Sequence, residues 1–183
     1  MLIFGSIAWA LPSPLLSWRR NWGTKTPIKL TLVGLVHDIG KLIKISSTKR
    51  NFARSSSSPG SNMDLHDFEM INECLMHDTL GSLMMEFWQM PAELTAVIRY
   101  HHQGHRAMRV GVESEDLNQL IDIVYLANLL VKKLEIGNSG HYITKVASPK
   151  FIESLGLDED RLIEIEHEIL KKYEESSSFL ATL

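Results

Sequence analysis

Apolar residues recur every three to four positions along most of this chain, which is the spacing of one face of an α-helix. No alternation of apolar and polar residues reaches the length of a strand, and no internal repeat is visible. The chain is therefore predicted to be all-α, a bundle of about six to seven helices. The periodic segments predict helices over residues 26–45, 63–76, 77–90, 92–102, 114–137, 148–156 and 158–173.

Prolines, glycines and small polar residues mark where several of these helices begin and end. Thr26 and Pro27 stand at the N-cap and first positions of the first helix. Ser114 caps the long helix, which Gly137 is expected to end. The first helix is apolar on most of its sides, which predicts a central place in the fold.

Two segments lack this periodicity. Residues 1–25 contain two prolines and three tryptophans, and we expect a poorly defined N-terminal arm there. Residues 46–62 are rich in Ser, Lys, Arg, Pro and Gly, so they predict a mobile loop, either a lid over a site or a disordered insertion. Residues 26–183, with that loop included, fit one helical domain.

The charges are unevenly distributed. The net charge of -3 gives no bulk attraction to nucleic acid, yet residues 1–60 carry nine basic residues and one acidic residue, Asp38. This asymmetry either places a basic surface suited to an anionic ligand beside Asp38 or reflects ordinary solvated faces. The single cysteine, Cys74, cannot form a disulfide within the chain and favours a reducing, cytoplasmic location. No segment reaches the roughly 20 apolar residues that a membrane span needs.

Histidines and one aspartate supply the candidate chemistry. His37 and Asp38 lie together in the apolar first helix, and His77 and the doublet of His101 and His102 follow downstream. Imidazole nitrogens and a carboxylate are suitable ligands for iron, manganese or zinc. A histidine in an apolar helix is also often a core residue that is hydrogen-bonded to a polar neighbour. Both interpretations are open on these residues alone.

A longer pattern surrounds these residues. From His77 to the doublet, the chain carries the phrase His-x3-Gly-x6-Trp-x2-Pro-x2-Leu-x3-Ile-x2-His-His, and Glu69 stands eight residues before it. With His37 and Asp38, this pattern resembles the HDOD family (HD-related output domain) of the HD superfamily of metal-dependent phosphohydrolases, to which the HD-GYP proteins are related. The resemblance covers residues from about 27 to 136. It implies an HD-domain-like helical bundle.

The resemblance also implies roles for individual residues. Asp38 corresponds to a carboxylate that can bridge two metals. Lys41, one turn after the His-Asp pair, matches a lysine that contacts phosphate in active relatives, so Asp38 and Lys41 are the catalytic candidates. The residues that match metal ligands are His37, Asp38, His77, His101 and His102.

Departures from the family pattern indicate a degenerate site. Active relatives take a first ligand, His or Glu, from an earlier helix, yet residues 1–36 contain no His, Asp, Glu or Cys. The usual closing aspartate is replaced by Asn128, which is a weaker ligand and offsets no cationic charge. Gln103 and Gly104 follow the doublet where HD-GYP enzymes have a longer signature, which disfavours that subclass. The N-terminal helical half of the family is not visible in the sequence, so we expect that half or a protein partner to complete the surface.

Three functions are open at this stage. The first is an HDOD-type regulatory or signal-transduction module that acts through protein or ligand binding, with a nucleotide as one candidate ligand. The second is a metal-dependent phosphohydrolase acting on nucleotides or cyclic nucleotides, in which metals activate a water for attack on a phosphoester. In the third, a purely structural domain, Glu69, Gln103 or Asn128 would hydrogen-bond the histidines. Loss of the first and last ligands favours the regulatory function, and the sequence does not decide whether the chain is an enzyme.

Overall fold

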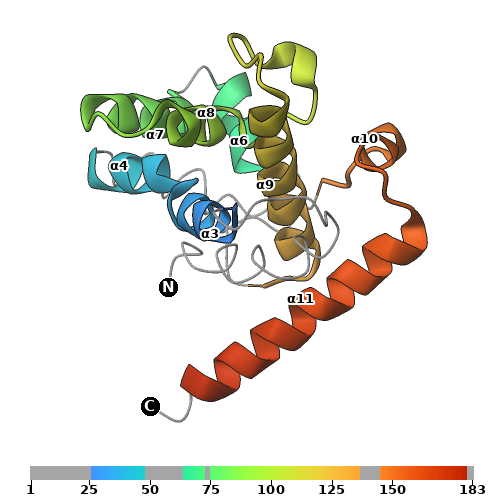
Figure 1. The fold of residues 1–183 in the computed structure, drawn as a ribbon. Coiled ribbons are helices and arrows are strands. Elements are labelled where there is room, and N and C mark those ends of the chain that lie inside the picture. The colour runs from blue at the N-terminus through green and yellow to red at the C-terminus, as the bar shows by residue number, and fades with distance from the viewer. Residues whose placement is uncertain (1–25, 48–63, 73–74, 137–144, 181–183) are drawn as a thin grey trace.

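All regular secondary structure is helical in the part of the chain that the computed structural model describes, residues 26–47, 64–72, 75–136 and 145–180 (Figure 1). These ranges hold eight α-helices, one 3-10 helix and no strand, which confirms the predicted all-α class. None of the helices within them is long and apolar enough to cross a membrane. The predicted arm at 1–25 and all but the first two residues of the predicted loop at 46–62 lie outside the described residues.

The helices follow the predicted order and differ from the prediction mainly at their ends. The last helix continues to Leu180, beyond the predicted end near residue 173, whereas the helix predicted over 63–76 occupies only 65–71. The 3-10 helix has no counterpart in the prediction. With the labels of Figure 1, the elements are α3 (Thr26–Val36), α4 (Ile39–Ser47), α6 (Leu65–Ile71), α7 (His77–Phe87), α8 (Ala92–Tyr100), η2 (Arg106–Met108), α9 (Glu115–Lys133), α10 (Pro149–Ser154) and α11 (Glu159–Leu180).

The helix predicted over residues 26–45 is broken in two at His37 and Asp38. These two residues form a turn between α3 and α4. The ring Nδ1 of His37 donates a hydrogen bond of 2.9 Å to the carbonyl of Gly34, the acceptor that a continuous helix would use for the backbone N–H of Asp38. A side chain that competes for a helical carbonyl in this way favours a local break. The break places both side chains of the His-Asp pair at a helix junction.

The hydrophobic core is centred on α9. Ile121, Val124 and Ala127 of this helix are completely inaccessible to solvent. The first helix, predicted to be central, is exposed along one side, because α3 leaves 74% of Ile28 and 48% of Leu35 accessible. The opposite side of α3 packs on α8 and α9, with Leu30 and Val33 in the core, so the prediction of a central helix holds for that side only.

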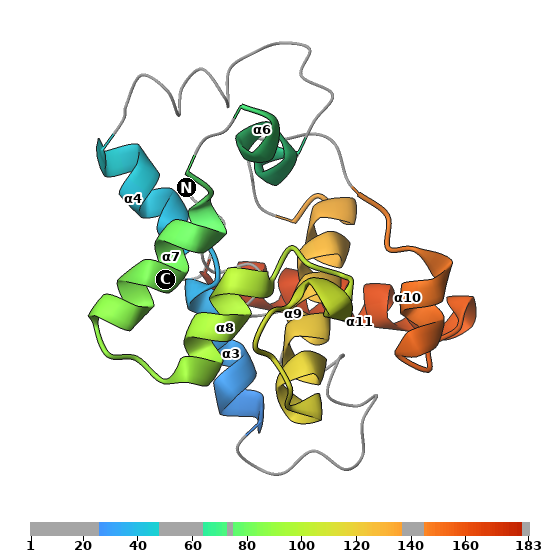
Figure 2. The ribbon, with the colours of Figure 1, turned by 90° about the horizontal axis from the view of Figure 1, so that it is seen from above.

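The helix α8 lies between the other helices that carry candidate residues (Figure 2). It packs against α7 and against α9, while α4 packs against α7, and α3 contacts both α8 and α9. Val97 and Ile98 of α8 are completely buried between these neighbours. This packing brings the turn between α3 and α4, the start of α7 and the end of α8 to one place.

Two glycines set how closely α4, α7 and α8 approach. A Cβ atom on Gly40 of α4 would lie 1.8 Å from the carbonyl oxygen of His77 and 2.8 Å from the backbone nitrogen of Gly81. A Cβ atom on Gly81 of α7 would lie 2.8 Å from Cγ2 of Ile98 on α8. A packed interior does not tolerate such separations, so α4 and α7 can meet this closely only with glycine at position 40. This contact places Asp38, two residues before Gly40, beside His77.

The substitution Gly40→Ala tests this packing constraint. The added methyl group meets backbone atoms that cannot rotate away, so we expect the free energy of unfolding to fall by about 3 kcal/mol or more, at the upper end for overpacking. Gly156→Ala is the control, because Gly156 has a φ of +71° and open space around its Cβ position. Only the left-handed backbone penalty of about 1–2 kcal/mol applies there. Chemical denaturation gives both values, and a smaller loss for Gly40→Ala than for Gly156→Ala would contradict the constraint.

Candidate functional site

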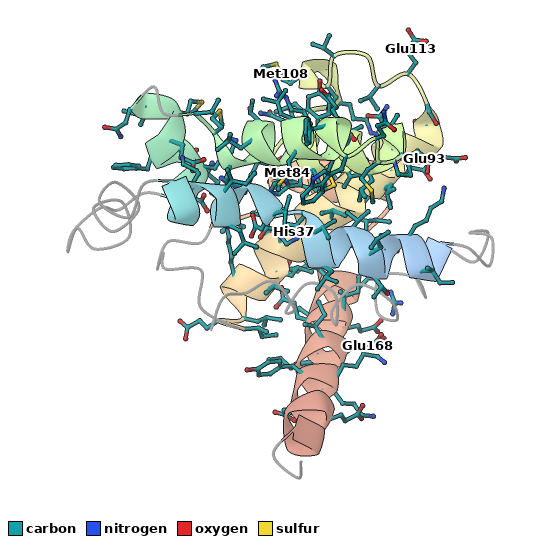
Figure 3. All side chains as sticks on the ribbon, turned by 90° about the vertical axis from the view of Figure 1, so that its left-hand side faces the viewer. His37, Met84, Glu93, Met108, Glu113 and Glu168 are labelled. Carbon is teal, nitrogen blue, oxygen red and sulfur yellow. The ribbon has the colours of Figure 1, made fainter. Side chains whose placement is uncertain are left out.

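A buried cluster of donor atoms forms where three helix ends meet. Asp38 comes from the turn between α3 and α4, His77 begins α7, and His101 and His102 directly follow α8. Each of these four residues offers one donor atom, and the four atoms all lie within 4.8 Å of one another. Figure 3 shows the neighbouring His37 in the interior, at the junction of α3 and α4. The structure thus brings together four of the five predicted metal ligands.

His37, the fifth predicted ligand, lies at the edge of this cluster. Its Nε2 is 3.3 Å from Oδ2 of Asp38, and its ring stands edge-on to the ring of His101 with the centroids 5.1 Å apart. It therefore touches the shared carboxylate but does not belong to the four-donor group. Lys41 lies on the same side, with its ammonium 2.7 Å from Oδ2 of Asp38.

Three of the histidines are oriented through their Nδ1 atoms. Nδ1 of His37 donates to the carbonyl of Gly34, and Nδ1 of His101 donates 2.7 Å to the carbonyl of Ile98. Nδ1 of His77 donates 2.7 Å to the carboxylate of Glu69. Because carbonyl and carboxylate oxygens only accept, each Nδ1 carries a proton, and each ring presents a lone pair at Nε2 when it is neutral. Histidines that bind metals are oriented in this way.

The Nε2 lone pairs converge on the carboxylate of Asp38. Nε2 of His77 lies 3.3 Å from Oδ1, and Nε2 of His101 lies 3.5 Å from the same oxygen. Oδ1 of Asp38 and the Nε2 atoms of His37 and His101 are buried without a hydrogen-bond partner. Acceptors that face one another in a buried site repel, and each unsatisfied polar group costs about 1–3 kcal/mol. A cation between them would remove both penalties.

The spacing of the donor atoms fits a divalent metal. With metal–ligand bonds of about 2.1 Å, neighbouring donors are about 3.0 Å apart in an octahedron and about 3.4 Å apart in a tetrahedron. The separations around Asp38 are 3.3 and 3.5 Å, and Nε2 of His77 lies 3.0 Å from Nε2 of His102. These three separations are close to those between ligands of one metal ion.

The charge states of the cluster are also those that metal ligands need. Burial would raise the pKa of Asp38, but the Lys41 ammonium and the neighbouring imidazoles hold it well below the usual range. Burial lowers the pKa of His101 to about 4, and burial together with the neighbouring imidazoles lowers the pKa of His102. Burial would lower the pKa of His77, but the neighbouring carboxylates of Asp38 and Glu69 outweigh it and raise the pKa. The carboxylate of Asp38 and the neutral imidazoles of His101 and His102 are ready to bind a cation, and a metal would compete with a proton at His77.

Glu69 supports His77 from α6. One oxygen of its buried carboxylate accepts the ring Nδ1 and, at 3.0 Å, the backbone N–H of His77. Its other oxygen lies 2.5 Å from the ammonium of Lys44 on α4. The helix α6 is itself fastened to α9 by an ion pair of 2.6 Å between Asp64 and Lys132. The expectation that Glu69 could hydrogen-bond an imidazole therefore agrees with the geometry.

A buried ion pair fixes the segment that follows the histidine doublet. The guanidinium of Arg109 donates twice to the carbonyl of Gln103, at 3.1 and 2.7 Å, and pairs with Asp122 of α9 at 2.6 Å. Arg109 and Asp122 are at most 3% exposed. They tie the end of α8 to α9, and sequence analysis did not single them out.

Two further buried residues adjoin the cluster and were missed from the sequence. His66 of α6 and Asp78 of α7 are 5% and 4% exposed, and Nε2 of His66 lies 3.3 Å from Oδ2 of Asp78. The signal in the sequence that could have indicated Asp78 is its position directly after His77, a predicted metal ligand. Asn128, at the position of the usual closing aspartate, is buried within α9.

An all-helical fold with a buried His-Asp cluster at a helix junction defines an HD-type domain. The sequence profile of the HDOD domain family matches residues 6–104, more than half of the chain, and the chain belongs to this family. The matched range begins upstream of residue 27, where we expected the resemblance to start, and ends before residue 136.

Two solved structures share the fold. One is a putative signal transduction protein from Marinobacter aquaeolei VT8, with 18% identity and a TM-score of 0.71, and the alignment covers 96% of this chain and 37% of that protein. The other is an HDOD domain protein with unknown function from Geobacter sulfurreducens, with 16% identity and a TM-score of 0.58, covering 94% of this chain and 60% of that protein. Both structures are thus considerably longer than the chain. No curated protein matches it.

The substitution Glu69→Gln tests the support of His77. The amide keeps the shape of the side chain but removes a negative charge that raises the pKa of His77, while burial, which lowers that pKa, is unchanged. We therefore expect the pKa of His77 to fall, as measured by NMR titration of the ring in protein treated with a chelator. Glu153→Gln, at an exposed position, is the control and should leave the titration unchanged. An equal or higher pKa of His77 in Glu69→Gln would show that Glu69 does not act on the ring.

Proposed function

We propose that this HDOD domain is a regulatory, signal-transducing module that binds a divalent metal, iron, manganese or zinc, and acts through binding rather than hydrolysis. The burial of its donor atoms carries this proposal. His77 and His101 have no exposed surface, and Asp38 is 5% exposed. A metal held by these residues would be enclosed on the sides that they occupy, as structural metal ions are. When bound, the ion would supply the positive charge that the converging acceptors lack.

The surroundings of Lys41 argue against hydrolysis. A lysine that contacts a substrate phosphate needs an accessible ammonium, but Lys41 is 8% exposed and lies 2.7 Å from Oδ2 of Asp38. Its charge is directed to the carboxylate of the cluster. Together with the replacement of the closing aspartate by Asn128, this arrangement favours a domain that has kept ligands and lost turnover.

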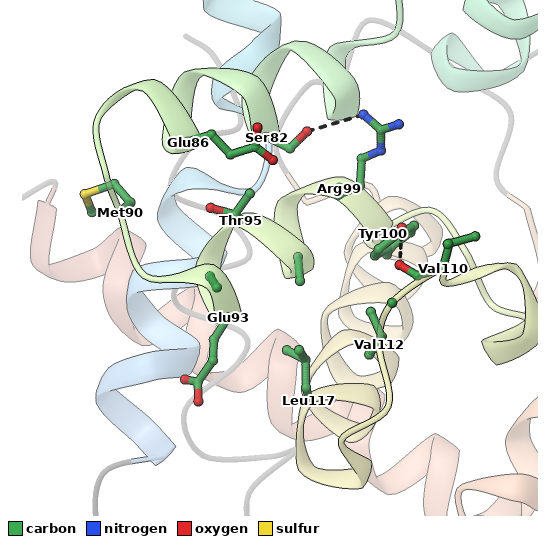
Figure 4. A pocket seen from close by; sticks show the side chains of 13 residues that line it. Ser82, Glu86, Met90, Glu93, Thr95, Arg99, Tyr100, Val110, Val112 and Leu117 are labelled. Carbon is green, nitrogen blue, oxygen red and sulfur yellow. Dashed lines mark hydrogen bonds between the residues drawn. The ribbon is translucent and has the colours of Figure 1, made fainter.

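A cleft on the same helices is the candidate effector surface (Figure 4). Its volume is about 750 Å³, and side chains of α7, α8, the start of α9 and the segment before α9 line it. Glu86 and Arg99 supply opposite charges, and Arg99 lies 3.5 Å from the hydroxyl of Ser82. Pockets of this size with a few polar groups take small ligands or peptide side chains.

Apolar residues beside the cleft suit a protein partner. Phe87, the last residue of α7, is 83% exposed, and Trp88, which follows it, is 49% exposed. Met90, which lines the cleft, is also exposed, whereas Met85 in the same segment is buried in the core. Aromatic residues and methionine are enriched at protein interfaces. We therefore propose a protein as the partner.

The helices α7 and α8 connect the cluster with the cleft. His77 begins α7, and Ser82 and Glu86 of the same helix line the cleft. Thr95 and Arg99 line it from α8, which the histidine doublet follows. A metal bound at one end of this helix pair would restrain the turn at its other end, because a closely packed pair moves as one body.

The alternative function is a metal-dependent phosphohydrolase acting on nucleotides or cyclic nucleotides. The observation in its favour is that the His-Asp pair and three further histidines are all retained in one cluster. A hydrolysis assay on the metal-loaded protein distinguishes this function from the regulatory one.

Hydrogen–deuterium exchange with and without zinc or manganese tests the regulatory proposal. We expect added metal to slow backbone exchange in the turn between α7 and α8 as well as at His77, because both ends of the helix pair are restrained. Asp38→Asn should abolish this protection, and Asp160→Asn, at an exposed position on α11, should leave it intact.

A hydrolysis assay on the same samples, with bis(4-nitrophenyl) phosphate as substrate, tests the alternative phosphohydrolase function. The proposal expects the same background rate in the metal-loaded wild type and in Asp38→Asn. A metal-dependent rate that Asp38→Asn abolishes, without loss of the fold, would establish the phosphohydrolase instead.

A further inference from the structure

We infer that His66 and Asp78 form a second divalent-cation site beside the first, a conclusion that rests on the proposed metal-binding function. The two residues come from different helices, α6 and α7, and neither belongs to the pattern that carries the family resemblance. The side chain of each is 6% exposed. Their chemistry, an imidazole and a carboxylate, suits manganese, iron or zinc.

His66 is the strongest evidence for this site. Both nitrogens of its ring are buried without a hydrogen-bond partner. Its Nδ1 lies 3.9 Å from Oδ1 of Asp67, too far for a hydrogen bond, and its Nε2 lies 3.3 Å from Oδ2 of Asp78 without the alignment of one. A ring with two unsatisfied nitrogens is costly to bury, so a ligand at Nε2 would explain its position.

Asp78 has one oxygen available for that ligand. Its Oδ1 accepts hydrogen bonds from the backbone N–H and, at 3.0 Å, the hydroxyl of Thr79. This leaves Oδ2 directed toward His66. The separation of 3.3 Å between Oδ2 and Nε2 falls within the range of about 3.0–3.4 Å that two ligands of one ion adopt.

The pair directly adjoins the first cluster. The ring of His66 contacts the ring of His102 at a tilt of 37° with the centroids 4.4 Å apart, and Nε2 of His102 is within hydrogen-bond distance, 3.0 Å, of Nε2 of His77. His102 thus stands between the two groups of donors. An ion at His66 and Asp78 would be a near neighbour of the ion at Asp38, so the two carboxylates would each offset part of the total charge.

The second site also supplies donor groups of the kinds that this chain lacks relative to the family pattern. The chain lacks an early ligand and has Asn128 in place of a carboxylate, whereas His66 and Asp78 add one imidazole and one carboxylate from other elements. Two protein ligands leave several coordination positions to water or to an anion, as is common for weakly held divalent ions. We therefore expect the second ion to bind more weakly than the first.

Manganese binding followed by the EPR signal of free Mn²⁺ tests this site on the full chain. The wild type should bind two ions, one tightly and one at least about tenfold more weakly. His66→Gln and Asp78→Asn should each lose the weak ion and keep the tight one. His167→Gln, at an exposed position on α11, is the matched control and should bind two. Thermal melts followed by circular dichroism confirm that each variant is folded, and two different substitutions guard against the failure of one.

The outcomes separate the two proposals. A single tight ion in the wild type that both variants retain unchanged would overturn the second site and leave the proposed function intact. Loss of both ions in a folded His66→Gln variant would also overturn it, because the donors would then belong to one site. No manganese bound to any protein, with zinc and iron equally unbound, would contradict the proposed function as well.

Discussion

The site depends on how the negative charge of the buried Asp38 carboxylate is compensated. A carboxylate that is 5% exposed is stable only when charge and hydrogen bonds compensate it. Lys41 supplies one cationic partner at 2.7 Å through Oδ2, while Oδ1 faces imidazole lone pairs and has no hydrogen bond. Because Nδ1 of His37, His77 and His101 already donates to a carbonyl or to Glu69, rotation of one of these rings cannot bring a proton to Oδ1 without the loss of that hydrogen bond. A cation at the centre of the cluster would therefore supply the partner that Oδ1 of Asp38 lacks.

The rest of the fold keeps this arrangement rigid. Gly40 permits α4 and α7 to approach until the start of α7 lies beside Asp38. Glu69 fixes the ring of His77 from α6, and Arg109 fastens the chain after the doublet to α9. Gly40 lies in α4, Glu69 in α6, and Arg109 in the segment between η2 and α9. A ligand at the centre would thus connect elements that are far apart in the sequence, which suits a domain whose output is a change in binding.

The parts of the fold that could be predicted from sequence are those with local causes. Ser114, Ser148 and Asp158 cap the helices that follow them because their side chains accept a backbone N–H within the same turn. The spacing from His77 to the doublet also identified the family, because it reflects how α7 and α8 pack. The all-α class follows directly from the period of the apolar residues.

The parts that could not be predicted depend on contacts between distant segments. The break at His37 requires the ring to take the carbonyl of Gly34, and an apolar pattern does not reveal this. The exposure of Ile28 depends on which neighbours cover α3. His66 was missed because a single histidine in a short helix gives no signal until α6 is placed against α7.

The X-ray absorption spectrum of the metal-loaded protein tests the central claim most directly. The account predicts nitrogen and oxygen ligands at about 2.0–2.2 Å, with the outer-shell scattering that imidazole rings produce. A spectrum of the hydrated ion, with an oxygen shell and no imidazole scattering, would contradict it, because the lone pairs that converge on Asp38 would then not be metal ligands.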